Sequence, residues 1–359
     1  MKKFITFLLM ISFWACSGSD DKTIEEYEYS TLLNVSSEDS SQNFLSPRSL
    51  EIVDEKIFLL DGYEDFVKVL NLNGEPLYSF GKKGSGPGEI ERPAKLISDS
   101  NGNILIYDIK NRRLNYFTQT GEFISSTSLS KIPFNLDLDS KDGIYIENKE
   151  YIDFKQAKSV YRLIYKLNDQ VVTIDSCAEK GIFLKEQEYT GPMSIPFQGR
   201  MFWILLPDGN LFVVFSEDYR IKIYDDSHRL IKEALREAPK VKVTEKDKEE
   251  FFNRMRIAGP AGRSEGAPAS IRNKIKFPTY KPFIEAIFIN EPEKKIYLKT
   301  SRGNDQYSVF DIFDFTGNFI KEVEVKEGVL NYPYFQGKIV YDIKTDETGE
   351  TVISKLERK

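Results

Sequence analysis

The sequence predicts an all-β chain, folded as a six-bladed β-propeller that an N-terminal strand closes, with one short helical insertion. A module of short apolar strands and small polar turns recurs six times along the 359 residues. Repeats of about 40 residues, each with about four strands, are typical of propeller blades. The sixth module stops one strand short, whereas Tyr27 to Val35 alternates weakly and has no hairpin partner nearby. Such a strand can complete the last blade and remove a free sheet edge.

The first residues predict a lipoprotein signal peptide over residues 1–15. Two lysines precede an apolar stretch from Phe4 to Ala15, which is too short to span a bilayer. Cys16 follows and would become the lipidated first residue. Residues 16–26 begin with a polar run and are expected to form a flexible tether. An ordinary secretory signal followed by a chance cysteine is the alternative.

The first module shows the strand order most plainly. An apolar strand at 56–61 leads to a second at 66–72, Asn73-Gly74 forms a hairpin turn, and residues 76–80 return. Several modules are preceded by a further apolar strand that opens with proline, where the missing N–H costs no ladder hydrogen bond. These expected innermost strands begin at Pro47, Pro93, Pro133 and Pro282.

The later modules repeat this order with less regular spacing. They begin near Asn103, Asp142, Asp208, Lys295 and Lys338. Large aromatic residues recur at strand positions and are expected to pack between blades, each contributing about 1.5–3 kcal/mol when fully buried. They are Phe58, Phe117, Phe212 and Phe310, and Trp203 is also assigned to the core.

One departure from β-structure lies between the fourth and fifth modules, at about residues 240–279. Thr244 to Asp247 resembles a capping box, Phe251, Phe252 and Met255 give a helix one apolar side, and Gly259-Pro260 ends it. Insertions in repeat proteins often gather on the binding face, but packing against a blade edge is an equal alternative. The expected propeller domain is therefore 27–359, with this insertion inside it.

The glycine-rich stretch Gly81 to Ile90 precedes the second module. Neither Lys-Ser nor Lys-Thr nor a helix follows it, so a blade-to-blade crossing that needs glycine is favoured over a phosphate-binding loop. Asp108 and Arg113 flank the next hairpin and are interpreted as a structural hydrogen-bonded pair.

This second module resembles one NHL repeat over residues 81–124. The matching positions are Gly84, Gly86, Pro87, Gly88, Glu89, Pro93, Asn101, Gly102, Asn103, Asp108, Asn111, Arg113, Phe117 and Gly121. The whole chain resembles six-bladed propeller lipoproteins of the Bacteroidetes type. That resemblance implies a propeller in the cell envelope, lipid-anchored at the outer membrane and exposed at the surface. Some relatives with NHL repeats are lyases that hold a metal with histidines, and the single histidine here, His228, does not fit that chemistry.

Charge and residue usage narrow the functional classes. The formal charge of −6 gives no support to binding of nucleic acid or of an anionic membrane surface, so we expect membrane contact through the lipid anchor only. Aspartates with calcium-loop spacing are absent from the sequence, and we expect no metal and no cofactor. Cys177 is expected to be a small apolar residue and not a catalytic thiol.

Basic residues near the start of predicted innermost strands give the candidate site. They come from four different blades and are Arg48, Lys95, Arg200 and Lys281. If all inner strands begin at one end of the axis, these side chains form a basic ring at the channel mouth that attracts a carboxylate, phosphate or acidic glycan. The alternative is that they are solvated residues where the strands begin.

Three functions stay open. We favour a non-enzymatic module that binds an extracellular or periplasmic ligand or protein, such as an acidic peptide or glycan. The second is an enzyme that processes extracellular carbohydrate or peptide with paired carboxylates in the channel, although the sequence pairs no particular residues. The third is a structural subunit of a surface complex.

Overall fold

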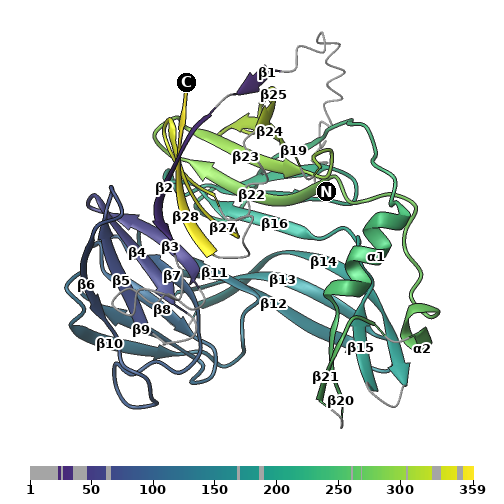
Figure 1. The fold of residues 1–359 in the computed structure, drawn as a ribbon, viewed down its shortest axis with the longest axis horizontal. Coiled ribbons are helices and arrows are strands. Elements are labelled where there is room, and N and C mark those ends of the chain that lie inside the picture. The colour runs from purple at the N-terminus through teal and green to yellow at the C-terminus, as the bar shows by residue number, and fades with distance from the viewer. Residues whose placement is uncertain are drawn as a thin grey trace, which may run out of the picture.

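The described strands form six sheets of four or five strands and one two-stranded hairpin (Figure 1). The computed structural model describes residues 23–25, 27–34, 47–61, 66–167, 170–185, 190–259, 262–267, 269–304, 306–325, 333–345 and 351–359. The signal peptide and Cys16 lie outside the described residues. Three residues of the expected tether, Thr23–Glu25, form strand β1.

The first three sheets are blades 1 to 3. Blade 1 contains β3 (Pro47–Val53), β4 (Lys56–Asp61), β5 (Phe66–Asn71) and β6 (Pro76–Phe80). Blade 2 contains β7 (Pro93–Ser98), β8 (Ile104–Asp108), β9 (Arg113–Phe117) and β10 (Phe123–Ser128). Blade 3 contains β11 (Asn135–Leu138), β12 (Ile144–Asp153), β13 (Lys158–Leu167), β14 (Gln170–Lys185) and β15 (Thr190–Ser194).

The remaining sheets are blades 4 to 6. Blade 4 contains β16 (Met201–Leu205), β17 (Leu211–Phe215), β18 (Arg220–Tyr224) and β19 (Leu230–Leu235). Blade 5 contains β22 (Ile284–Asn290), β23 (Lys295–Thr300), β24 (Ser308–Asp314) and β25 (Phe319–Val325). Blade 6 contains β26 (Tyr334–Gln336), β27 (Ile339–Thr345), β28 (Thr351–Arg358) and β2 (Tyr27–Asn34).

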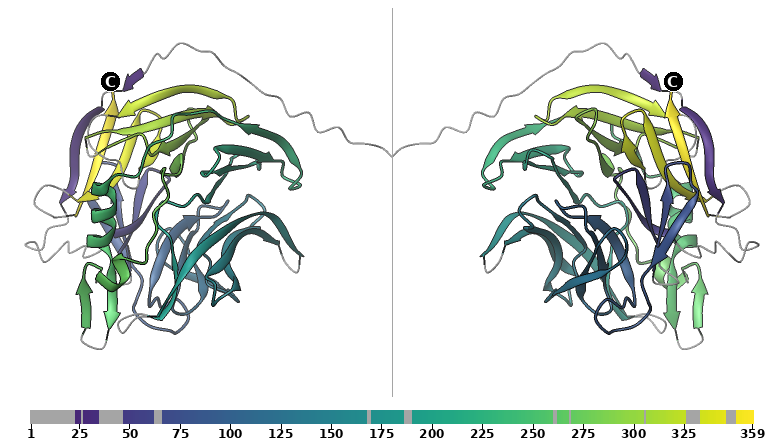
Figure 2. Two further views of the ribbon diagram at one scale, coloured as in Figure 1. Left: turned by 90° about the vertical axis from the view of Figure 1, so that its right-hand side faces the viewer. Right: turned by 90° about the vertical axis from the view of Figure 1, so that its left-hand side faces the viewer.

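An N-terminal strand closes the ring, as the sequence predicts. Strand β2 pairs antiparallel with β28, with Tyr27 opposite Arg358 and Asn34 opposite Val352. Figure 2 shows the purple N-terminal strand alongside the yellow C-terminal strands. Upstream of it, β1 pairs in parallel with β25, so that Thr23 lies opposite Val323. The two ends of the chain are therefore joined through one blade.

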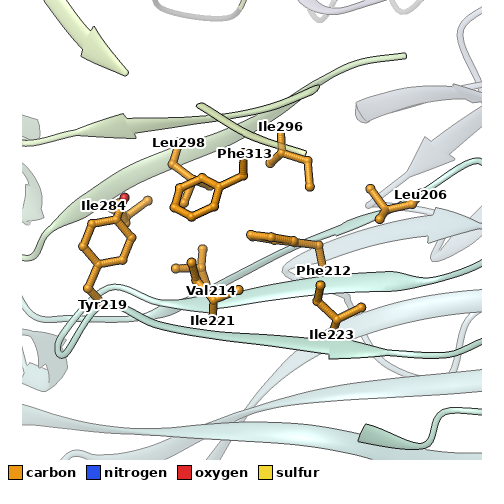
Figure 3. Packing of buried hydrophobic residues seen from close by; sticks show 10 residues of the cluster. All are labelled: Leu206, Phe212, Val214, Tyr219, Ile221, Ile223, Ile284, Ile296, Leu298 and Phe313. Atoms are coloured by element: carbon orange, nitrogen blue, oxygen red, sulfur yellow. The ribbon is translucent and has the colours of Figure 1, made fainter. Parts of the chain in front are cut away.

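Buried apolar clusters fill the spaces between neighbouring blades. Phe58 and Phe117 belong to the cluster of blades 1 and 2, Phe212 to that of blades 4 and 5 (Figure 3), and Phe310 to that of blades 5 and 6. Trp203 lies between blades 3 and 4. A cluster with Tyr341 and Ile57 joins blade 6 to blade 1, so apolar packing confirms the predicted roles of these aromatic residues and closes the ring.

Strand direction defines two faces of the propeller. Because the strands of a blade run antiparallel, its outer strand ends on the face where the next inner strand begins. We call this the top face. It carries the connections between blades and the turns between second and third strands, and the bottom face carries the turns between third and fourth strands.

The insertion contains helix α1 (Glu245–Arg254), a hairpin of β20 (Arg256–Gly259) and β21 (Gly262–Glu265), and the short helix α2 (Ala269–Arg272). Thr244 and Asp247 form the predicted capping box, but the helix ends at Arg254 and not at Gly259-Pro260, because Arg256–Gly259 pairs as a strand with β21. Phe252 and Ile271 pack against Leu184 of β14, and Figure 1 shows both helices beside the far ends of β14 and β15. The insertion thus contacts blade 3, although it follows blade 4 in sequence. Within the described ranges, no helix is long and apolar enough to cross a membrane.

Candidate functional site

Among the predicted site residues with a described side chain, Arg200 is the one whose charged group has no hydrogen-bonded or ion-pair partner. It lies just before β16, where its backbone N–H donates to Ser216 Oγ at 2.8 Å. Its guanidinium carbon lies 4.6 Å from the ring centroid of Phe134 and 4.8 Å from that of Phe202. Among the side chains that the structure describes, none forms an ion pair with Arg200. Two aromatic rings therefore hold a cation that forms no ion pair with any carboxylate of the described residues.

Lys281 also lies on the top face but has an acidic partner. Its Nζ is 2.6 Å from Asp247 Oδ1, and both side chains are largely buried. The other carboxylate oxygen of Asp247 accepts the backbone N–H of Thr244 at the start of α1. These bonds and the Lys281 charge keep the pKa of Asp247 below its ordinary value, although burial opposes the shift. Lys281 therefore fastens the insertion to blade 5.

The other two predicted residues do not join this group. Lys95 Nζ donates to the carbonyl oxygen of Leu136 at 2.6 Å and to Asn135 Oδ1 at 3.2 Å, so it bridges blades 2 and 3. Arg48 lies in β3 at a register shift between Pro47 and Ser49, and its side chain is outside the described part of the structure. The ring of four cations therefore stays a prediction. Two of its members, Arg200 and Lys281, lie at the start of the inner strands of neighbouring blades, 4 and 5.

Ser216 connects the surroundings of these two residues. Its backbone N–H donates to the Arg200 carbonyl, and its own carbonyl accepts the N–H of Phe283, which lies two residues after Lys281. The inner strands of blades 4 and 5 are thereby tied together at their beginnings.

A cavity of about 250 Å³ opens on the top face between blades 4 and 5 and the insertion. Its lining residues are Phe197, Gln198, Glu217, Lys240, Pro278, Thr279, Tyr280, Lys281, Pro282 and Phe283. Lys240 Nζ lies 5.7 Å from the ring centroid of Tyr280 and 5.8 Å from that of Phe283, and no described side chain forms an ion pair with it. The cavity thus combines an available ammonium group with aromatic walls.

Sequence reasoning missed most of this cavity. Lys240 and Glu217 are not at the start of an innermost strand, and Phe197 precedes its strand by four positions. The proline-rich run Pro278 to Pro282 was the one available signal, because it marks the chain's return from the insertion to blade 5.

Glu147 lies behind Arg200 and is almost fully buried. Its Oε2 accepts the indole N–H of Trp203 at 3.0 Å. Burial raises its pKa above the ordinary value, and the Arg200 charge and the Trp203 bond only partly oppose this shift. Neither Glu147 Oε1 nor Arg200 Nε has a hydrogen-bond partner, although both atoms are buried.

The central channel holds a second group of titratable side chains. Burial first, and then the charge of Asp137, raise the pKa of Glu51 to about 8, against a hydrogen bond from Ser98 that lowers it. Burial and Asp137 also raise the pKa of Glu291. Carboxylates of blades 1, 3 and 5 therefore interact electrostatically across the channel.

Asp108 and Arg113 lie opposite each other in the β8–β9 ladder, but their side chains do not bond to each other as expected. The Asp108 carboxylate accepts the backbone N–H groups of Glu91 and Arg92. Arg113 donates to the carbonyl oxygens of Gly86 and Glu89. The two residues hold the glycine-rich crossing loop from different sides, in agreement with its structural role.

Cys177 and His228 have no features of a catalytic pair. Burial and surrounding carboxylates raise the pKa of the Cys177 thiol to about 11, which keeps it protonated and weakly nucleophilic. His228 lies in a turn, with Nε2 3.0 Å from the Tyr145 hydroxyl. In the described part of the chain, no three His, Cys, Asp or Glu side chains are grouped as metal ligands.

This architecture is a six-bladed β-propeller with a ligand-sized cavity on its top face. The chain belongs to a family described as 6-bladed beta-propeller, whose sequence model matches residues 37–232. Protein lin-41 of Caenorhabditis elegans is 42% identical over 50 residues, which are 14% of this chain and 4% of that protein. The chain therefore spans a small part of this curated relative.

Two solved structures from Bacteroides have the same fold. A protein of Bacteroides fragilis described as exported has 14% identity and a TM-score of 0.55, over 94% of this chain and 96% of its own. A protein of Bacteroides vulgatus has 11% identity and a TM-score of 0.53, over 94% and 98%. At these identities the similarity concerns the fold alone.

Proposed function

We propose that this protein is an exported, lipid-anchored binding module that takes an acidic peptide or glycan on its top face. The observation that carries this proposal is Arg200, whose guanidinium is held between Phe134 and Phe202 without a carboxylate partner among the described residues. A planar guanidinium can bind a carboxylate or phosphate through two parallel hydrogen bonds. Because the aromatic rings already fix its orientation, little side-chain entropy is lost on binding.

Further support comes from the neighbouring cavity, which adds the Lys240 and Lys281 ammonium groups on the same face. These cations lie on a chain of net charge −6, so attraction of an anion is local and requires the right position on the surface. The glycine-rich loop and its clamps belong to the fold and need no ligand.

Binding of acidic ligands tests the proposal directly. The chain from residue 17 onward is screened by calorimetry against uronate oligosaccharides and glutamate-rich peptides, with neutral analogues alongside. We expect Arg200→Gln to weaken anion binding by about tenfold, as for loss of one charge-assisted hydrogen bond. Arg112→Gln, at an exposed turn of blade 2, is the matched control. Equal affinities for wild type and Arg200→Gln reject this site.

The cellular address is part of the proposal. It rests on the apolar stretch before Cys16 and agrees with the Bacteroides fragilis protein, which is described as exported. In a bacterium grown with a labelled fatty acid, the wild-type chain should incorporate label and Cys16→Ser should not. Label in both chains would mean that the lipid is attached at a residue other than Cys16. Label in neither chain would reject the proposal of a lipid anchor.

A second candidate function is hydrolysis in the channel. It is favoured by the raised pKa of Glu51 and Glu291 together with the nearby charge of Asp137, because an acid and a base of different pKa are what glycoside hydrolysis requires. If this function holds, glycan or peptide fragments accumulate with the wild-type chain and not with Glu51→Gln. If the ligands are still intact after prolonged incubation, the hydrolytic function is rejected and binding is the function that remains.

A further inference from the structure

We propose that the cavity between blades 4 and 5 and the insertion binds one acidic sugar ring, a uronate, at the end of a glycan. The inference rests on the proposed function, since it names the ligand class of the same face. It concerns a different set of side chains from Arg200, and the two can therefore be tested separately.

The size of the cavity favours a single ring. Its volume of about 250 Å³ lies just below the roughly 300–1,000 Å³ of pockets for drug-sized ligands. One pyranose ring with a carboxylate fits this scale, whereas a longer segment has to leave the cavity and continue over the surface toward Arg200.

The aromatic walls suit the apolar face of a sugar. Phe197, Tyr280 and Phe283 line the cavity together with two prolines. The C–H groups on one face of a pyranose are apolar and pack against aromatic rings, while its hydroxyl groups point to the edge. Tyr280 is 41% exposed, so its ring can be covered by a ligand.

Phe197 is held in a conformation that large side chains avoid. Its φ is 57°, in the left-handed region where a bulky residue is uncommon. Its ring centroid lies 6.1 Å from that of Phe277 and 5.8 Å from Lys281 Nζ. The insertion and blade 5 thus keep this ring at the cavity wall, as binding sites that retain backbone strain do.

The polar groups distinguish a uronate from an acidic peptide. Lys240 supplies the cation for the carboxylate, since Lys281 is paired with Asp247. Glu217 also lines the cavity, and its Oε2 accepts the N–H of Gly199 at 3.0 Å. A carboxylate beside the ligand repels an acidic side chain but accepts hydrogen bonds from sugar hydroxyl groups. A ligand with both an anion and hydroxyl donors satisfies Lys240 and Glu217 together.

The test compares trigalacturonate, neutral galactotriose and a tetraglutamate peptide, each titrated into the chain from residue 17 onward. We expect trigalacturonate to bind most tightly and Lys240→Gln to weaken it about tenfold. Lys155→Gln, at an exposed site in blade 3, should leave the affinity unchanged. Glu217→Gln should strengthen the peptide, because it removes a repelling negative charge. It should shift the preference away from the sugar, because the amide oxygen of glutamine is a weaker acceptor for sugar hydroxyl groups than a carboxylate.

The outcomes separate this inference from the proposed function. If tetraglutamate binds best, or if Lys240→Gln has no effect while Arg200→Gln weakens binding, the uronate cavity is wrong and the anion-binding function stands. If neither trigalacturonate nor tetraglutamate binds, both the uronate cavity and the anion-binding function are rejected. Folding of each variant is checked by its thermal unfolding midpoint, so a lost affinity is not confused with a lost fold.

Discussion

Glu51 shows how one carboxyl group in the channel couples stability to pH. Its pKa is raised to about 8, first by burial and then by Asp137, with Glu291 adding to the shift and Ser98 and Lys95 opposing it. In the unfolded chain the pKa of a glutamate is about 4.3. The folded state therefore favours the protonated form, and the stability that this form contributes is complete below about pH 4.3 and is lost as the pH rises to about 8.

Replacing Glu51 with glutamine removes this dependence. We expect Glu51→Gln to raise the thermal unfolding midpoint at pH 9 by about 2 °C or more relative to wild type, and by much less at pH 5. Glu55→Gln, in an exposed turn, is the control and should change neither value. Parallel midpoint curves for wild type and Glu51→Gln from pH 5 to pH 9 would show that the channel does not hold Glu51 as described.

Two glycines with a positive φ allow the cost of backbone strain to be measured apart from the cost of a steric clash. Gly121 has a φ of 88°, and a Cβ there would lie 2.3 Å from Phe80 Cβ in blade 1. Gly209 has a φ of 84°, but its nearest contact would be Asp226 Cβ at 3.3 Å. Gly209→Ala should therefore cost mainly the backbone term of about 1–2 kcal/mol, with a small shift of Asp226, and Gly121→Ala should cost clearly more in chemical denaturation. Equal losses would mean that Phe80 moves aside freely.

The candidate site was only partly predictable from single residues. Arg200 and Lys281 follow the same sequence rule, but the first stacks on Phe134 and the second pairs with Asp247. These partners are 66 and 34 residues away, respectively, counting 200 − 134 and 281 − 247. The position of a basic residue at the start of an inner strand predicts the face on which it lies. Whether its charge is free to bind a ligand depends on partners that are distant in sequence and close only in the fold.

At the scale of elements, the outer strands of four blades share a β-bulge. The extra residue is a large aliphatic, and it follows the turn between the third and fourth strands. These residues are Leu77, Ile124, Ile231 and Ile320, which are 48%, 48%, 58% and 46% exposed. A bulge twists an edge strand and hinders pairing with another chain. Apolar character at these positions therefore reflects edge geometry and not burial.

The insertion should behave as a unit that unfolds apart from the blades. Phe252 is 6% exposed and lies in the cluster of α1, α2 and the end of β14, while Phe310 is fully buried between blades 5 and 6. We expect Phe252→Ala to speed proteolysis within residues 240–279 with little change in the global unfolding midpoint. Phe310→Ala should cost about 3–5 kcal/mol globally. A global loss of the same size for Phe252→Ala would make the insertion part of the cooperative core.

At the scale of the whole molecule, repetition made the fold predictable. Six modules and the weak strand at Tyr27 each correspond to an observed element, because a blade repeats the same turns and apolar spacing. Pro47 and Pro93 open their inner strands as expected, whereas the strands after Pro133 and Pro282 begin two residues later, at Asn135 and Ile284. The lengthened blade 3 was not predictable: the end of β14 continues past β13 and pairs with a fifth strand, β15, and the insertion packs on it from a distant part of the sequence. Packing between non-neighbouring modules leaves no periodic signal.

Ring closure gives the last prediction, because β2 is the only described strand that joins the N-terminal segment to the last blade. A chain that begins at Val35 lacks β2 and leaves the edge of β28 open, so we expect its unfolding midpoint to fall by at least about 5 °C and its apparent mass to rise with concentration through edge pairing. A chain that begins at Tyr27 keeps β2 and loses β1, a strand of three residues that pairs with the outer strand β25 of blade 5. It should stay monomeric and nearly as stable as the chain from residue 17. Light scattering and thermal unfolding of the three chains distinguish the cases. A monomeric and equally stable chain from Val35 would mean that the apolar cluster between blades 6 and 1 closes the ring without β2.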